Sequence, residues 1–426
     1  MGRRRSKSGS PPEQKWVAAE SKVGRAKRAA IAGEKHTFPE SVAGDEMADT
    51  ADASGESDNA YDEPLFQRVI QYAADADRDV IDMVSGHPDW EPPAALREGL
   101  HAYADADSRA FQYPPSEGLR ELREEIAARR NVGISRIVVT NGAGEANYLA
   151  MASAMEREAG SEFLLTDPVY PYYPGKARLL DADATRVPVR EDGHVDVDAM
   201  RSAATDDTAA IVINTPNNPT GAVYDREAVA ELAEIAGAVD ALLVVDEVYD
   251  HFDFSNRFES ALTLEEDHVV VTSAFSKSLA ITGFRVGYAV FPEDLVDEAL
   301  TRHMLVNVAT SRPAQAAVAS ALRETPPTYY ESVRGRLRAR IDAFTDALDA
   351  AGAEYTTPDG AFYVLARFED FPGTRANVER LIDEAGVAGM PGEAFGDAYD
   401  EWIRFALCTD RADEAAGRLA AYFEDR

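Results

Sequence analysis

Short apolar segments recur along the middle of the chain and predict buried β-strands. Their apolar residues are contiguous and rich in β-branched side chains, rather than alternating with polar ones. This pattern is typical of strands that are covered on both faces, as in a parallel sheet. The segments are residues 135–140, 209–213, 241–245 and 268–272.

Helical patterns lie between these strands. In residues 117–130, Leu119, Leu122 and Ile126 fall on one face of a helix, and residues 225–237 also favour a helix. Because strands and helices alternate, the sequence predicts an α/β fold with a mainly parallel sheet between helices.

The pattern changes near residue 326. A long helical pattern over residues 326–351 is followed by a predicted strand, a predicted helix and a second predicted strand, at residues 361–366, 377–385 and 402–406. This mixture indicates a smaller α+β domain. We therefore expect a large domain over residues 92–325 and a small domain formed by residues 61–91 and 326–426.

The first 60 residues differ from the rest. They are polar and charged and show no sustained apolar period, so we expect a disordered extension. The three arginines at residues 3–5 are not followed by an apolar stretch long enough for an export signal. A basic arm for nucleic acid is one alternative. Another is that translation starts at Met47, where an acidic composition begins.

Charge is distributed unevenly. The chain has 43 basic and 76 acidic residues, a net charge of −33, yet residues 1–46 alone carry +4. The remainder carries −37 and keeps only two lysines, Lys176 and Lys277. Such a surface holds water and cations at high salt, so it predicts a halophilic protein; an acidic mesophilic protein is the alternative. The negative charge disfavours nucleic acid and anionic lipid as partners.

Several classes of protein are disfavoured by composition. The longest apolar run spans six residues, 361–366, whereas a membrane-spanning helix needs about 20. The single cysteine, Cys408, cannot form an internal disulfide and indicates the cytoplasm. The seven histidines show no metal-ligand spacing, so no metal site is expected.

Polar and charged side chains follow the predicted strands directly. In an open parallel sheet, ligands bind at the carboxyl ends of the strands, so these residues are expected to meet at one edge. They form a glycine-containing turn, an amide, a carboxylate and a lysine with an arginine eight residues beyond it. These are Asn141 to Gly144, Asn217 and Asn218, Asp246, Lys277 and Arg285.

Four stretches together resemble a known family. They begin at Tyr113 (YPPSEGLRELR), Asn217 (NNPTG), Asp246 (DEVY) and Ser276 (SKSLAITGFRVGY). In this order and spacing, residues 61–426 resemble the class I/II aminotransferases that depend on pyridoxal 5′-phosphate (PLP), the aspartate aminotransferase family of fold type I. The resemblance implies a homodimer that moves an amino group from an L-amino acid to a 2-oxo acid in two half-reactions.

The resemblance assigns roles around the cofactor ring. Lys277 corresponds to the Schiff-base lysine, which also moves the Cα proton. Asp246 corresponds to the partner of the pyridine nitrogen. The alternative is that it caps a helix, as an aspartate at a strand–helix junction often does. Asn218 and Tyr249 correspond to the residues that bind the ring 3′-oxygen. The family also has a cis bond at the position of Asn218–Pro219.

The phosphate and the face of the ring are matched as well. Ala143 and Gly144 are expected at a helix N-terminus, where free N–H groups favour an anion. Arg285 corresponds to the phosphate-binding arginine. The resemblance implies that Tyr113 reaches the phosphate of the other subunit, and that Tyr170 stacks on the pyridine ring.

The substrate side of the site is matched with two departures. Arg404 corresponds to the arginine that binds the substrate α-carboxylate, and Gly86 and Asn218 are expected beside it. Ala274 stands where the family often has a phosphate-binding serine. Gly144 stands where one subgroup of aspartate aminotransferases has a lysine for the distal carboxylate. A neutral or aromatic amino donor is therefore at least as compatible with the sequence as aspartate.

Other activities remain open at this stage. A C–S lyase or an amino-acid decarboxylase would use the same cofactor and fold. A PLP-binding regulator would need a DNA-binding domain, and the first 60 residues show no helix-turn-helix pattern. The Gly142-x-Gly144 pair resembles a dinucleotide fingerprint, but Asn147 stands at its third glycine position.

Overall fold

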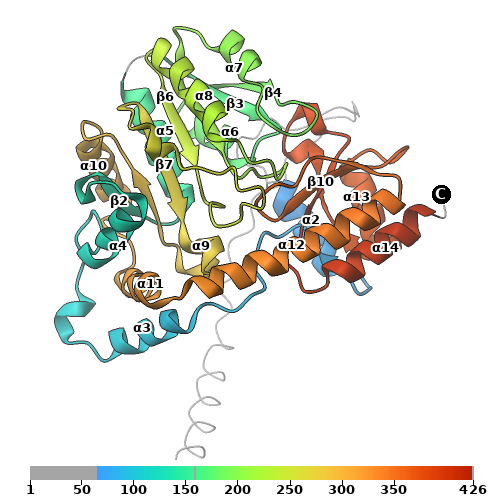
Figure 1. Cartoon of the computed structure of the whole chain (residues 1–426), viewed down its shortest axis with the longest axis horizontal. Helices are drawn as coiled ribbons and strands as arrows, with labels where there is room; N and C mark the ends of the chain where they lie inside the picture. The colour runs from blue at the N-terminus through green and yellow to red at the C-terminus, as the bar shows by residue number, and fades with distance from the viewer. Residues whose placement is uncertain (1–64, 158–159, 425–426) are drawn as a thin grey trace, which may run out of the picture. The chain divides into compact units, whose positions relative to one another are not determined.

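A seven-stranded sheet forms the larger part of the fold. The computed structural model describes residues 65–157 and 160–424, so the predicted extension over residues 1–60 lies outside the described residues. The strands lie in the order β2-β8-β7-β6-β5-β3-β4 (Figure 1). All neighbouring strands run parallel except at β8, which is antiparallel to both β2 and β7. The strands are β2 (Ile137–Thr140), β3 (Glu162–Asp167), β4 (Asp183–Pro188), β5 (Thr208–Asn214), β6 (Leu242–Asp246), β7 (Val269–Ala274) and β8 (Gly287–Val290).

Helices cover both faces of this sheet. One apolar core joins one face to α5 (Ala143–Glu156), α6 (Tyr172–Leu179) and α10 (Val296–Asn307). The other face packs against α4 (Arg120–Arg130), α7 (Val197–Ala203), α8 (Arg226–Ala238) and α11 (Arg312–Glu324), with α3 (Ala94–Ala104) against α11. Every residue of β5, β6 and β7 is therefore buried, which explains their uninterrupted apolar sequences.

A second sheet is built from the C-terminal part of the chain. It is antiparallel, in the order β12-β13-β10-β9, and comprises β9 (Glu354–Tyr355), β10 (Tyr363–Arg367), β12 (Met390–Pro391) and β13 (Ile403–Ala406). Its core includes residues of α2 (Leu65–Asp75), α12 (Pro327–Ala350), α13 (Arg375–Ala385) and α14 (Ala412–Glu424). In Figure 1, α12 (orange) runs from beside α11 to the helices around this sheet.

The segment before the large sheet joins the C-terminal part. β1 (Ile81–Asp82) pairs in parallel with β11 (Val387–Ala388). The seven-stranded sheet lies within residues 137–290 and the four-stranded sheet within residues 354–406. The boundaries of the two domains stay a prediction. Within residues 65–157 and 160–424, no helix has the length and apolar character needed to cross a bilayer.

The helices and strands expected from the sequence are present, with ends that differ by a few residues. The helix expected from residue 225 begins at Arg226, because the Asp225 side chain accepts the backbone N–H of Ala228 as a cap. The sequence patterns did not predict β3, β4 or β8. Five of the six residues of β4, on the sheet edge, are exposed, and β8 contains only four residues, Gly287–Val290.

Candidate active site

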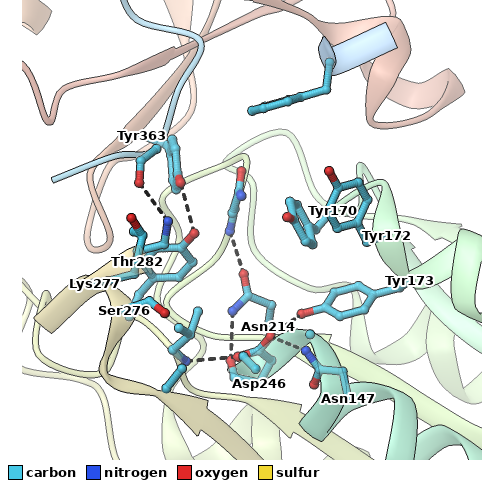
Figure 2. Close-up of a pocket in the computed structure, with 18 of the residues that line it drawn as sticks. Asn147, Tyr170, Tyr172, Tyr173, Asn214, Asp246, Ser276, Lys277, Thr282 and Tyr363 are labelled. Carbon is cyan, nitrogen blue, oxygen red and sulfur yellow. Dashed lines mark hydrogen bonds between the residues drawn. The ribbon is translucent and has the colours of Figure 1, made fainter. Parts of the chain in front are cut away.

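A cavity of about 320 Å³ opens at the carboxyl ends of β2, β5, β6 and β7. All of the cofactor and substrate residues that the resemblance assigns line it except Tyr113. Figure 2 shows Lys277 on one side, Asp246 on the floor and Tyr170 on the opposite side. The parallel sheet thus brings together side chains that are more than 100 residues apart, as its topology requires.

Asp246 is held by a dense set of hydrogen bonds. Its Oδ2 accepts from Asn147 Nδ2 and from the Tyr173 hydroxyl, each at 2.7 Å, and its Oδ1 accepts from Val248 N at 3.0 Å (Figure 2). Burial raises the pKa of the Asp246 carboxyl, while the three donors oppose that rise. Thr272 fixes Asn147 by donating to its Oδ1 at 2.5 Å. The Asp246 carboxylate is therefore a fixed acceptor that faces the cavity.

Lys277 lies in α9 (Phe275–Ser278), which begins immediately after β7. Its Nζ donates to the Gly86 carbonyl at 2.7 Å and lies 6.0 Å from the centroid of the Phe362 ring. Burial lowers the pKa of the Lys277 amine to about 8. A Cβ atom at position 86 would clash with the Tyr363 hydroxyl, so the packing of Tyr363 against this residue requires glycine.

Arg404 is almost fully buried, with 1% of its surface exposed. It lies on β13, which is an inner strand of the four-stranded sheet. Its Nη1 donates to Asn218 Oδ1 at 3.2 Å, and its Nη2 contacts the Val84 carbonyl. No carboxylate oxygen within residues 65–157 and 160–424 pairs with this guanidinium, and its Nε has no partner there. A buried arginine in this state is suited to an incoming carboxylate.

An anion-binding end lies where α5 begins. Gly142 is the N-cap residue of α5, so the first backbone N–H groups of the helix, from Ala143 onward, point toward the cavity end. Arg285 lies beside them and donates to the carbonyls of Thr282 and Asn141, at 2.9 Å and 3.2 Å. Gly142 has a φ of +78°, and a Cβ there would lie 2.5 Å from Arg285 Nη2. Any other residue at position 142 would be strained at this φ, and its Cβ would also push the exposed Arg285 guanidinium away from the helix end.

We expect Gly142→Ala to lower the free energy of unfolding of the cofactor-free protein by about 1–3 kcal/mol. The alanine would combine a left-handed backbone with a clash against Arg285. Gly175→Ala, in α6, is the matched control, since a Cβ there meets nothing within 4 Å and alanine favours helix. Denaturant unfolding of both variants measures the effect. Equal stability of Gly142→Ala and the wild type would contradict the argument.

Aromatic side chains form another wall. Tyr170 lies 4.9 Å from Tyr172 and 5.8 Å from Tyr173, measured between ring centroids. The hydroxyl of Tyr249 is hydrogen-bonded to that of Tyr363 at 3.0 Å. By contrast, Tyr113 is 83% exposed and is absent from the cavity wall. The bond between Asn218 and Pro219 is cis, as expected from the resemblance.

Comparison with known proteins identifies the family. The model of the family described as aminotransferase class I and II matches residues 78–419. The aspartate aminotransferase of Pyrococcus horikoshii is 30% identical over 377 residues, covering 84% of this chain and 93% of the relative. The chain belongs to the class I and II aminotransferases. The aspartate/prephenate aminotransferase of Thermus thermophilus is 31% identical over 354 residues, covering 80% of this chain and 90% of the relative.

Solved structures of aminotransferases share the fold. That of the Thermus thermophilus aspartate aminotransferase with maleate superposes with a TM-score of 0.78 and 29% identity, covering 86% of this chain and 99% of that one. That of the Mycobacterium tuberculosis N-succinyldiaminopimelate aminotransferase superposes with a TM-score of 0.77 and 29% identity, covering 85% and 97%. The predicted fold type I is confirmed. The protein is a PLP-dependent aminotransferase, and the lyase, decarboxylase and regulator alternatives are not favoured.

Several residues of this aminotransferase site were missed by sequence reasoning. Asn147 was considered only as a failed dinucleotide glycine, yet it binds Asp246. Tyr173 lies three residues after Tyr170, at helical spacing, and this spacing was the available signal. Lys176 was visible as one of two lysines after residue 47. Tyr363 lies in an apolar run that gave no sign of a site.

Proposed function

We propose that the cavity of this aminotransferase binds PLP through the residues expected from the sequence. The observation that carries the proposal is that the Lys277 amine, the Asp246 carboxylate and the N-terminus of α5 face one cavity. An amine of lowered pKa, a buried acceptor and an anion site fit an aldehyde, a pyridine nitrogen and a phosphate, respectively. Tyr170 would lie on the face of the ring, and Asn218 and Tyr249 would reach its 3′-oxygen.

When bound, PLP supplies an aldehyde that takes up the amino group and a ring that withdraws electrons from the substrate Cα. The Arg404 guanidinium binds the α-carboxylate and thereby presents the Cα–H bond to Lys277. Lys277 Nζ takes the proton from the substrate Cα and later releases a proton, so the same amine acts first as a base and then as an acid. Asp246 maintains a negative charge beside the pyridine nitrogen throughout.

We further propose an amino donor with an aromatic or neutral side chain. The walls of the cavity include the rings of Phe66, Tyr170 and Tyr172. Gly144 has no side chain to meet a distal carboxylate, and the space around a Cβ there is empty to 4 Å. Several relatives are named for aspartate, so this preference separates the chain from them. The acceptor is a 2-oxo acid.

A substitution at Gly144 tests the donor preference. We expect Gly144→Lys to raise kcat/KM for aspartate relative to phenylalanine by about 10-fold, because the ammonium would pair with the distal carboxylate. Gly144→Met is the matched control, with an apolar side chain that enters the same space. Steady-state kinetics with both donors give the ratio. If Gly144→Met changes it as much as Gly144→Lys, charge does not determine the preference.

We propose a homodimer in which Tyr113 contacts the phosphate site of the second subunit. Tyr113 is exposed in the single chain, and Leu305, Val306 and Val308 near the end of α10 are exposed apolar residues as well. Such residues favour burial against a partner. Sedimentation in high salt tests the oligomeric state, and a monomer that retains full activity would overturn the proposal.

The acidic composition supports adaptation to high salt, and the single unpaired thiol, Cys408, supports a cytoplasmic enzyme. We propose that the enzyme is halophilic and cytoplasmic, and we expect it to be most stable in concentrated salt. Many of the arginines pair with carboxylates at the surface, where salt screens charge.

An absorption titration tests the function directly. PLP is added to the cofactor-free protein at high salt, and the visible band of bound cofactor is recorded before and after each amino acid of a panel. We expect a band that aromatic or neutral amino acids bleach, with release of the corresponding 2-oxo acid and amination of an added acceptor. Release of a thiol or of carbon dioxide in place of the 2-oxo acid would overturn transamination. Absence of any band would overturn PLP binding.

A further inference from the structure

Lys176 is a buried cation that the proposed mechanism does not use. It lies on α6, lines the cavity and is 9% exposed. Its Nζ donates to the Tyr172 carbonyl at 3.4 Å and lies 5.8 Å and 5.7 Å from the ring centroids of Tyr172 and Tyr173. No carboxylate oxygen within residues 65–157 and 160–424 lies within 4.0 Å of it.

This position opposes a charged side chain. The ammonium is removed from water without a carboxylate in direct contact, which is costly. The single hydrogen bond that it makes, to the Tyr172 carbonyl, is long at 3.4 Å. Burial accordingly lowers the pKa of Lys176 to about 8. Since packing alone would favour an apolar residue here, the charge requires a reason.

Tyr173 lies between this charge and Asp246. One face of the Tyr173 ring is near Lys176 Nζ, and the hydroxyl of the same ring donates to Asp246 Oδ2 at 2.7 Å. The influence is mutual. The negative charge of Asp246 raises the pKa of Lys176, and the positive charge of Lys176 lowers the pKa of Asp246. Asp246 is thus the carboxylate that interacts with this cation.

We propose that Lys176 is a positioning residue for Asp246: its buried ammonium keeps the Asp246 carboxylate ionised for the pyridine nitrogen of PLP. The inference rests on the proposed function of the cavity. Burial favours the neutral form of Asp246, and the donors Asn147, Tyr173 and Val248 together with the charge of Lys176 favour the ionised form. The titratable groups that interact with Asp246 are Tyr170, Tyr173, Lys176, Tyr249 and Lys277.

The charge of Lys176 has a definite effect on cofactor binding. Removal of a nearby cation raises the pKa of Asp246, so its carboxylate becomes protonated at a higher pH. Protonated Asp246 cannot pair with a protonated pyridine nitrogen. Without the charge of Lys176, PLP affinity is therefore lost at a higher pH than in the wild type as the solution is acidified. The effect decreases as pH rises, because the Asp246 carboxyl becomes ionised with or without Lys176.

The test is the dissociation constant of PLP between pH 5 and 8, measured from the visible band in concentrated salt. Salt at about 1 M screens exposed charges beyond roughly 3 Å and leaves buried pairs less affected. Lys176→Met removes the charge and Lys176→Arg retains it. Arg178→Met, on the exposed side of the same helix, is the matched control for loss of a cation.

We expect the acid-side midpoint of PLP binding to rise by about 0.5–1 pH unit in Lys176→Met. Lys176→Arg and Arg178→Met are expected to retain the wild-type profile. An unchanged profile in Lys176→Met would overturn the inference. So would a normal profile with a raised KM for acidic amino acids alone, since Lys176 would then bind substrate. If the wild type itself binds no PLP, the proposed function fails, which is a distinct outcome.

Discussion

Lys277→Ala is expected to abolish the visible band of bound PLP and to lower the transamination rate by about 10³-fold or more. Lys277 Nζ is both the group that holds the cofactor and the base that moves the Cα proton, and loss of a positioned base alone costs about 10²–10⁴-fold. The only other lysine in residues 47–426 is Lys176, which lies on α6 beside Tyr173. We do not expect it to replace Lys277. Absorption spectra and single-turnover rates measure the two effects.

Lys277→Arg is the matched control for charge, because it retains the cation but its guanidinium remains protonated. We expect it to be as inactive as Lys277→Ala. Because burial lowers the pKa of the Lys277 amine to about 8, we also expect PLP uptake by the wild type to accelerate as pH rises through 8. A band of normal intensity in Lys277→Ala would show that another group holds the cofactor.

Asp246→Asn is expected to lower kcat by about 10²–10³-fold, comparable to the loss of one preorganised electrostatic group. The amide is nearly the same size as the carboxylate, and its oxygen can still accept from Asn147 and Tyr173, while the Val248 N–H loses its acceptor. It has no negative charge with which to retain a proton on the pyridine nitrogen. The fold is therefore preserved while the electron-withdrawing state of the ring is lost. Steady-state kinetics with the PLP-saturated enzyme measure the effect.

Stability separates this electrostatic role from a structural one. Burial raises the pKa of Asp246 above 3.8, its value in the unfolded chain. The unfolded state therefore loses this proton first, and the carboxyl destabilises the cofactor-free fold progressively as pH rises above about 4. Relative to the wild type, Asp246→Asn should gain free energy of unfolding as pH rises above about 4, until the folded wild type has also lost this proton. A pH-independent difference, or wild-type kcat, would contradict the assigned role.

Much of the site is encoded locally. The strand that ends in Asp246 is recognisable because its residues are apolar and contiguous, and it is buried on both faces. Lys277 and Arg285 are eight residues apart, and this spacing is evident in the sequence because Lys277 closely follows the apolar segment 268–272. The exposed strand β4 lacked such a pattern, so its place at the sheet edge was not predicted.

The sequence by itself determined the strands that end at the site, the family motifs and the residues that follow those strands, because these signals are contained within short segments. Only the tertiary structure decided which distant groups support the expected site residues. Tyr173 reaches Asp246 across 73 residues, and Thr272 reaches Asn147 across 125. The charge of Lys176 matters for the same reason, since its effect on Asp246 depends on how Tyr173 of α6 reaches the end of β6. Burial and distance set the strength of these interactions, and neither can be read from residue type and spacing alone.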